Sequence, residues 1–149
     1  MRFEVAWGYL WLVLPAMVVL LLLTAALSVF LAAANVYARD TQHLLELALL
    51  AWIWMTPIIY QWDLQARQLA DRGVSPMVTL LNPMTSIVLA FQRSLYGITV
   101  TDDGARQLPL ESSLWYFRNL GVVIVVAGVL VVLAMRLFAR IEGSFSEEL

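Results

Sequence analysis

The sequence predicts an all-α integral membrane protein with three transmembrane helices and one or two further helices that are re-entrant or interfacial. Of its 149 residues, 62% are hydrophobic and 13% are charged, and the mean hydropathy is +0.81. A soluble core of this size does not need so much apolar surface. The apolar residues also form long runs separated by polar breaks, which is typical of membrane spans. We treat residues 1–149 as a single membrane domain.

The composition excludes several classes of function. The net charge of −2 comes from nine arginines, eleven carboxylates and no lysine, and no basic patch indicates a nucleic-acid partner. The absence of cysteine excludes disulfides and thiol catalysis, and the lone His43 cannot form a metal site by itself. No nucleotide-binding, zinc-protease or nucleophile-elbow motif is present. We therefore predict no catalytic residue, no cofactor and no metal, and expect any energy from ATP to come from a partner.

The first predicted span covers about residues 10–34 and is interrupted only by Pro15, Thr24 and Ser28. Its 25 residues are long enough, as a helix, to cross a hydrocarbon layer of roughly 30 Å. A secretory signal is the alternative, because three successive alanines at 32–34 imitate a cleavage site. The apolar run is, however, longer than the ~7–15 residues of a signal core.

The second apolar run, residues 44–60, is at the short limit for a span. Pro57 removes a backbone donor and disfavours helix at Thr56, so we expect a kink or an end there. Glu46 is either an interfacial acid that complements the helix dipole or a transport-path residue. The aromatic residues of this stretch predict a membrane-interface belt, with a sugar-stacking surface as the alternative: Trp52, Trp54, Tyr60 and Trp62.

A polar break between these two runs, residues 35–43, predicts a tight turn. Asp40 or Thr41 could cap the following helix by accepting hydrogen bonds from its free N–H groups. The turn is either a simple solvated loop or a contact point for a partner in the cytosol.

Residues 61–113 contain four arginines and five carboxylates and cannot lie in lipid as irregular chain. Within them, Asn82 as a cap, Pro83 at the first position and Gly97 as a stop predict a helix. That helix is too short to span, so we expect it to be re-entrant or interfacial. One apolar face is predicted for it, made of Met84, Ile87, Val88, Phe91 and Leu95. Further on, Asp103-Gly104 suits a small hairpin.

The last predicted span covers about residues 114–138, followed by a tail at residues 139–149. Small residues predict close helix packing on one face of the first span and one face of the last: Ala25, Ser28 and Ala32, and Gly121 and Gly128. Arginines flank both sides of the predicted spans, so charge alone leaves the orientation open.

The order of these segments resembles the C-terminal half of the membrane subunit of ABC-2 type polysaccharide exporters, the permeases for O-antigen, capsule, teichoic acid or galactan. The residues that carry the resemblance are NVYARD at 35–40, MTPIIY at 55–60, LNPMTSIVLAFQRSLYG at 81–97 and the tail FARIEGSFSEEL at 138–149. Through their order and spacing, the resemblance extends over nearly the whole chain. Members of this family usually have about six spans. The resemblance therefore implies a fragment, a shortened gene model or a split subunit.

The resemblance also implies partners and a place in the cell. The protein would be a multi-pass permease of the inner (cytoplasmic) membrane that moves a lipid-linked glycan between two permease copies, with a separate nucleotide-binding ATPase subunit. The turn would be cytosolic and would contact that ATPase through Asn35, Val36, Tyr37, Arg39 and Asp40. Residues 61–113 would then lie outside and the tail inside.

The translocation path implied by the resemblance would run past the end of the second span and the following re-entrant helix. The residues assigned to it are Trp52, Trp54, Pro57, Tyr60, Asn82 and Arg93. The aromatic faces would stack on sugar rings, and Arg93 would meet a carrier phosphate. The alternatives for Arg93 are a structural ion pair or a side chain that snorkels to the interface.

Two functional hypotheses of different classes remain. The first is the transport subunit, with an ABC-2 exporter of drugs or lipids as the variant on cargo. The second is a non-transporting membrane anchor or assembly subunit whose spans pack against a larger complex. A membrane enzyme is the weakest reading, because no span carries the groups that catalysis needs.

Overall fold

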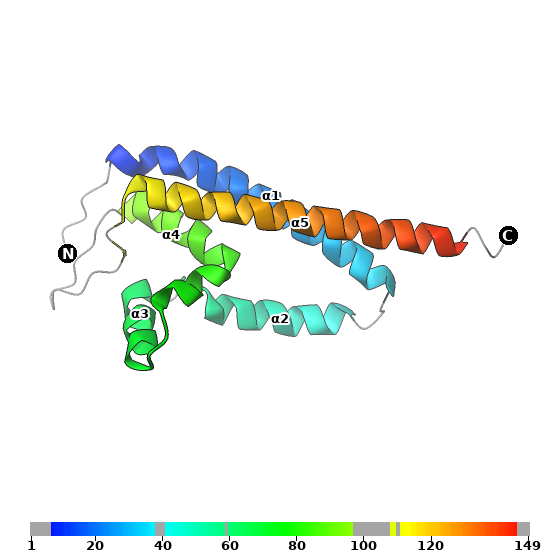
Figure 1. Ribbon diagram of the computed structural model, residues 1–149, viewed down its shortest axis with the longest axis horizontal. Helices are drawn as coiled ribbons and strands as arrows, with labels where there is room; N and C mark the ends of the chain where they lie inside the picture. The colour runs from blue at the N-terminus through cyan, green and yellow to red at the C-terminus, as the bar shows by residue number, and fades with distance from the viewer. Residues whose placement is uncertain (1–6, 38–40, 59, 97–107, 110, 146–149) are drawn as a thin grey trace.

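The structure is a computed structural model that describes residues 7–37, 41–58, 60–96, 108–109 and 111–145. Over those ranges the chain is helical and contains no strand. In chain order the elements are the 3₁₀ helix η1 (Trp7–Leu12), α1 (Val13–Tyr37), α2 (Thr41–Met55), α3 (Trp62–Asp71), the 3₁₀ helix η2 (Pro76–Leu81), α4 (Pro83–Tyr96) and α5 (Ser113–Phe145) (Figure 1). The expected helical class is confirmed.

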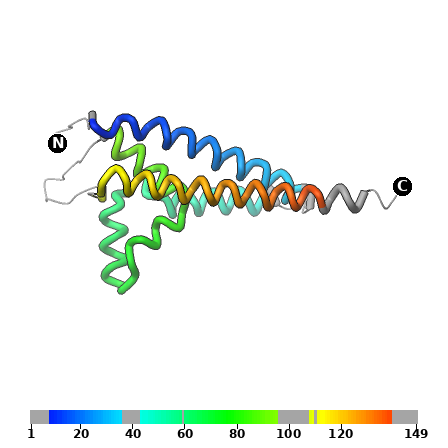
Figure 2. The backbone as a smooth tube through the Cα atoms, turned by 45° about the horizontal axis from the view of Figure 1, so that its top comes forward, coloured from blue at the N-terminus to red at the C-terminus, as the bar shows by residue number. Residues whose placement is uncertain are grey.

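Two long apolar helices form the body of the molecule. The segments Gly8–Asn35 and Ser113–Ala139 have mean hydropathies of 2.6 and 2.8 and are long enough to cross a membrane. α1 and α5 lie side by side, run in the same direction and make the most extensive contact between helices (Figures 1 and 2). Trp11 and Phe117 stack at the end where both begin, with ring centroids 4.7 Å apart.

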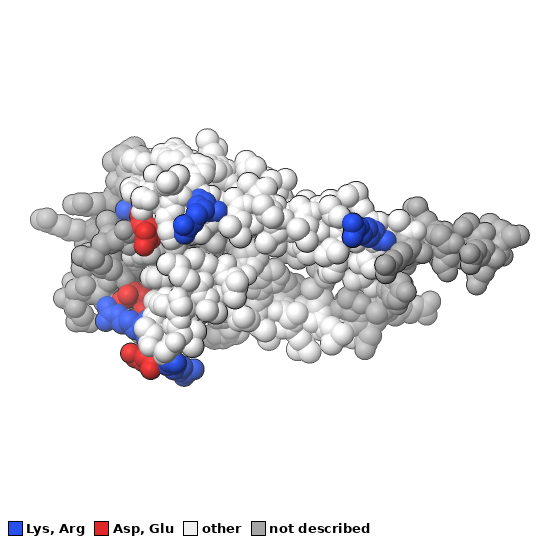
Figure 3. All heavy atoms as spheres, viewed as in Figure 1, with Lys and Arg blue, Asp and Glu red and all other residues white. Residues whose placement is uncertain are grey.

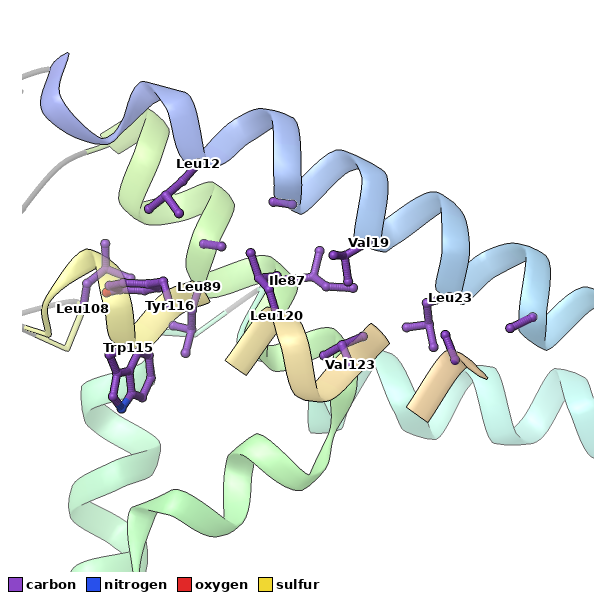
Figure 4. Close-up of a cluster of buried hydrophobic side chains, with 14 residues drawn as sticks. Leu12, Val19, Leu23, Ile87, Leu89, Leu108, Trp115, Tyr116, Leu120 and Val123 are labelled. Atoms are coloured by element: carbon purple, nitrogen blue, oxygen red, sulfur yellow. The ribbon is translucent and has the colours of Figure 1, made fainter. Parts of the chain in front are cut away.

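The core lies where α1, α4 and α5 meet. Leu12, Val19 and Leu23 of η1 and α1 point toward Leu120 and Val123 of α5, with side chains of α4 beside them (Figure 4). Small residues such as alanine alternate with these larger ones, so the two long backbones can approach closely. Burial of these side chains fixes the register of the two helices.

The small-residue faces expected from the sequence are not the faces that pack within this chain. Ala25, Ser28 and Ala32 are exposed on α1, and a Cβ added at Gly121 or Gly128 would meet nothing within 4 Å. The buried faces hold larger residues as well as alanines, because fit along the whole α1–α5 contact decides the packing, not residue size alone.

α4 buries most of its expected apolar face and several polar side chains beside it. Ile87 lies in the core, and Met84 and Phe91 pack against it, whereas Leu95 is 50% exposed. The buried polar side chains are Thr85, Ser86, Arg93 and Ser94. Because lipid cannot satisfy polar groups, polar side chains of a membrane helix are directed into the protein, where α4 places them beside its buried apolar residues.

α2 ends at Met55, one residue before Thr56, as Pro57 predicts. The helix has 15 residues and is therefore about 22 Å long, against a hydrocarbon layer of roughly 30 Å. Two helices long enough to span are present in the described part of the chain, and the third expected span, residues 44–60, is not a continuous helix. Most side chains of α2 are exposed and apolar, including Leu44, Leu47 and Leu50.

α3 and η2 form an arm on one side of the molecule (Figure 2) that the sequence reading missed. Asp63 and Arg67 form an i,i+4 ion pair on α3 with Oδ2 and Nη2 2.7 Å apart, a pattern that supports a helix. Gly73, at φ +71°, reverses the chain after α3, as a glycine past a helix end commonly does. No helix was predicted for this segment because it contains few apolar residues.

In the view of Figure 3, most charged side chains lie toward the end that carries the α3 arm, and uncharged residues separate them from one further basic group. Four of the charged residues lie on or next to the α3 arm, and Arg136 lies near the end of α5. This distribution matches two apolar helices that cross a bilayer. The expected hairpin at Asp103-Gly104 and the expected cap at Asp40 fall outside the described residues.

Enlarging a residue in the α1–α5 contact should destabilise the protein. Ala26 is 1% exposed, so Ala26→Leu has no room and should cost about 1–3 kcal/mol. We expect a lower midpoint of heat-induced aggregation for the purified protein in detergent.

The neighbouring Ala25 is exposed and provides the matched control. Ala25→Leu should leave the midpoint close to that of the wild type. If Ala25→Leu were the damaging change, the helix faces assigned here would be wrong.

Candidate functional site

The site is built where α2 stops. A helix end leaves backbone carbonyls without intrahelical partners, and lipid offers no water to satisfy them. Here side chains supply the donors. The Thr56 hydroxyl donates to the Trp52 carbonyl at 2.8 Å, and the Gln92 amide of α4 donates to the Pro57 carbonyl at 3.1 Å.

Asn82 joins α2 to the start of α4 and uses all four of its side-chain hydrogen-bonding positions. Its Oδ1 accepts from Trp52 Nε1 at 2.6 Å and from the backbone N–H of Met84 at 3.1 Å. Its Nδ2 donates to Thr56 Oγ1 at 2.9 Å and to the Met55 carbonyl at 3.4 Å. The bond to Met84 confirms Asn82 as the cap of α4. Two of the other bonds tie that cap to α2, and the third ties it to Thr56, directly after α2.

An apolar groove of about 640 Å³ lies beside this junction, between α2, α3 and η2. Its lining residues are Ala48, Ala51, Trp52, Met55, Gln65, Leu69, Val78, Thr79, Leu81, Asn82 and Pro83. Two of the path residues expected from the sequence, Trp52 and Asn82, therefore line one surface.

Trp54 and Tyr60 form a second group, outside the lining of the groove. The Tyr60 hydroxyl donates to the Trp54 carbonyl at 3.0 Å, which folds the chain after Pro57 back along the end of α2. The Trp54 side chain is 64% exposed. The face of the Trp54 ring is therefore open to a ligand. The indole N–H of Trp52, in contrast, is already hydrogen-bonded to Asn82.

Arg93 lies apart from both groups, inside the protein. Its side chain is 5% exposed, and its guanidinium lies 4.3 Å from the ring centroid of Tyr9. Nε and Nη1 of Arg93 are buried and have no hydrogen-bond partner in the described part of the chain. Stacking on an aromatic ring stabilises a desolvated guanidinium by about 2 kcal/mol, which offsets only part of its desolvation cost.

The expected ATPase contact is described only in part. Asn35 is exposed near the end of α1, and Val36 and Tyr37 complete that helix. Arg39 and Asp40 fall outside the described residues. The contact therefore stays a prediction.

Glu46 lies on the exposed side of α2, 3.8 Å from Nδ1 of His43. Both side chains are open to solvent in this chain, so the pair contributes little. Across the described residues, no group of three histidine, cysteine or acidic side chains could hold a metal ion.

Three partners in these contacts were missed by sequence reasoning: Thr56, Gln92 and Tyr9. A threonine before a proline at a helix end was the available signal for Thr56, because its hydroxyl can bond back to the preceding turn. Gln92 and Tyr9 gave no signal, because their partners lie 35 and 84 positions away in the sequence.

Comparison with known proteins gives one informative match. An O-antigen export system permease protein of Myxococcus xanthus is 35% identical to this chain over 98 residues, which is 64% of this chain and 36% of that protein. The chain thus spans 36% of the length of this relative. No family model and no solved structure matches the sequence. The match confirms the resemblance to polysaccharide-export permeases.

Removing the hydrogen bonds of the Asn82 side chain should destabilise the contact between α2 and α4. Asn82→Ala leaves the Trp52 N–H and the Met55 carbonyl without their partners and should cost about 1–3 kcal/mol for each group left buried. Because Trp52→Phe removes one of the same bonds, the double variant should be less damaging than the sum of the two. We expect a coupling energy of about 0.5–3 kcal/mol from heat stability in detergent.

Gln68 is exposed on α3, so Gln68→Ala serves as the control and should be neutral. Additive effects of Trp52→Phe and Asn82→Ala would show that the two side chains do not act together.

Proposed function

We propose that this chain is the C-terminal membrane part of the permease subunit of an ABC exporter that carries a lipid-linked polysaccharide across the cytoplasmic membrane. The match to the O-antigen export permease carries the proposal, and the apolar helices support it. A separate nucleotide-binding subunit would hydrolyse ATP. A second permease copy would complete the path.

The direction of the helices supports three passes through the membrane. α1 and α5 run in the same direction (Figure 1), so the chain between them has to return across the bilayer if both of them span. α2 runs in the opposite direction and is the apolar segment available for that return. α2 alone is shorter than the hydrocarbon layer. The bent segment after Met55, which is hydrogen-bonded to Asn82 and to Gln92 of α4, would cover the remaining distance.

This arrangement gives a route for movement from an ATPase to the path. In the proposed orientation, the turn at 35–40 and the end of α5 lie in the cytosol, and the α3 arm lies outside. A push on the turn would move α2. Because the other end of α2 is hydrogen-bonded to Asn82, and the residues that follow it are bonded to Gln92, α4 would move with α2.

The contacts of the path residues suggest a division of roles. The polar atoms of Trp52 and Asn82 are already paired within the chain, so we assign these residues to the brace between α2 and α4, together with Pro57. Trp54 and Tyr60 are assigned to the path itself, because the exposed ring of Trp54 can present an apolar face to a sugar while its neighbours stay fixed.

Arg93 is the residue that would bind the phosphate of the lipid carrier. Its Nε and Nη1 groups, buried and without acceptors among the described residues, suit a phosphate, which forms charge-assisted hydrogen bonds with a guanidinium. A phosphate would reach them only after Tyr9 and η1 moved aside. Arg93 would therefore act during a conformational change of the transporter.

Capture of the ATPase tests the function. When the tagged chain is purified from its native membrane, we expect an ABC ATPase subunit to come with it. The double change Arg39→Ala with Asp40→Ala should abolish that capture, because it removes both charges of the turn.

The ion pair of Arg67 with the half-buried Asp63 on α3 is the matched control, since α3 lies far from the end of α1 (Figure 1). Changing both to alanine should leave the ATPase bound. Capture of an unrelated complex, in place of an ATPase, would support an anchor or assembly subunit and contradict the exporter.

Export assays test the path residues. Trp54→Ala and Arg93→Ala should lower the amount of polysaccharide at the cell surface by at least about tenfold, the effect of losing about 1.4 kcal/mol of stabilisation. Trp54→Phe should retain most export, because it keeps an aromatic face.

Ile53→Ala is the control on α2, since Ile53 is 48% exposed and carries no aromatic ring. Protein levels in the membrane are measured for each variant. Normal export and normal level in Arg93→Ala would remove Arg93 from the path.

A further inference from the structure

The groove beside α2 has almost no free polar groups. Trp52 Nε1 is paired with Asn82, and Thr79 Oγ1 accepts from Trp62 Nε1 at 3.2 Å and donates to the Pro76 carbonyl at 2.8 Å. Among the polar side chains of the lining, Gln65 makes no hydrogen bond in the described part of the chain, and its Oε1 is buried.

The small number of unpaired polar groups in the lining determines which class of ligand the groove can bind. A sugar or a peptide brings many donors and acceptors, and each one left unpaired in an apolar site costs free energy. The groove could satisfy very few of them. A hydrocarbon chain needs none, and the volume of about 640 Å³ lies within the usual range of roughly 300–1,000 Å³ for ligand pockets.

The surroundings of the groove match a lipid that lies along α2. Ala48 and Ala51 are small and open the wall of α2 toward α3, and the exposed Leu44 and Leu47 continue the apolar surface along the helix. At the other end, the exposed arginines of the α3 arm mark a polar boundary (Figure 3). An amphiphile would therefore be oriented with its head beside α3.

We propose that this groove binds one acyl chain of a bilayer phospholipid, with the lipid head near Gln65 and the chain running along Ala51 and Ala48. The bound lipid fills the space between the α3 arm and α2, and so supports a helix that packs little against the rest of the chain. The proposal does not depend on what the protein transports.

Photolabelling in vesicles tests this site. The full chain is reconstituted in phosphatidylcholine vesicles that contain a trace of phosphatidylcholine with a photoactivatable group on one acyl chain, and labelled residues are mapped by mass spectrometry. We expect labelling to concentrate on Ala48, Ala51 and Val78. Leu50 and Ile53, which are 58% and 48% exposed on the rest of α2, should be labelled about tenfold less, because contact there is transient.

Ala51→Trp and Leu50→Trp form a matched pair of variants. Ala51→Trp fills the groove and should reduce labelling of Ala48 and Val78 by about tenfold, whereas Leu50→Trp should leave it unchanged. Both variants are compared with the wild type by size-exclusion chromatography. If Ala51→Trp does not fold, the distribution of label on the wild type still decides the question.

Three outcomes would overturn the proposal. Even labelling of all exposed residues of α2 would show a general lipid contact without a site. Labelling by a photoactivatable polyprenyl phosphate but not by the phospholipid would assign the groove to a carrier lipid. Cross-linking of Ala51→Cys between two copies in place of lipid labelling would assign it to a second chain. None of these outcomes measures export, so the proposed function would stand or fall separately.

Discussion

The structure depends on how the carbonyl groups at the end of α2 are satisfied. Pro57 stops the helix while it is still beside apolar surroundings, and lipid cannot supply the missing donors. Asn82, just before α4, donates to the Met55 carbonyl, and Gln92 of α4 donates to the Pro57 carbonyl. Asn82 also caps α4. The same side chain therefore fixes the end of α2 and the start of α4, and we expect the two helices to move together.

A second constraint is that apolar side chains cover the outside of the protein as well as its interior. The α1–α5 contact is built from alanines and medium-sized apolar residues, and many large apolar side chains face outward. α4 directs Thr85, Ser86 and Arg93 into the protein. In water this would be unstable, but in a bilayer the hydrophobic effect does not drive helices together, and packing fit and internal polar contacts decide their arrangement.

These constraints divide the candidate functional residues by their contacts. Trp52 and Asn82 are held in the brace, Trp54 presents an open ring, and Arg93 is a buried charge stacked on Tyr9. The apolar groove between α2 and α3 is chemically distinct from all of these. The region around the end of α2 thus contains a hydrogen-bonded junction, an exposed aromatic ring and an apolar groove. This combination suits a protein whose helices move within a bilayer.

The sequence by itself determined the membrane class, the two long spans, the end of α2 before Pro57 and the cap at Asn82, because all of these follow from local composition and backbone chemistry. It did not determine which faces of the long helices pack together, since the small-residue faces of α1 and α5 stay open. Nor did it determine that α4 buries Thr85 and Ser86 beside its apolar residues. Only the tertiary structure placed Gln92 on the Pro57 carbonyl and Tyr9 on Arg93. Such contacts join residues 35 and 84 positions apart, and their partners are selected by packing, which no local pattern records.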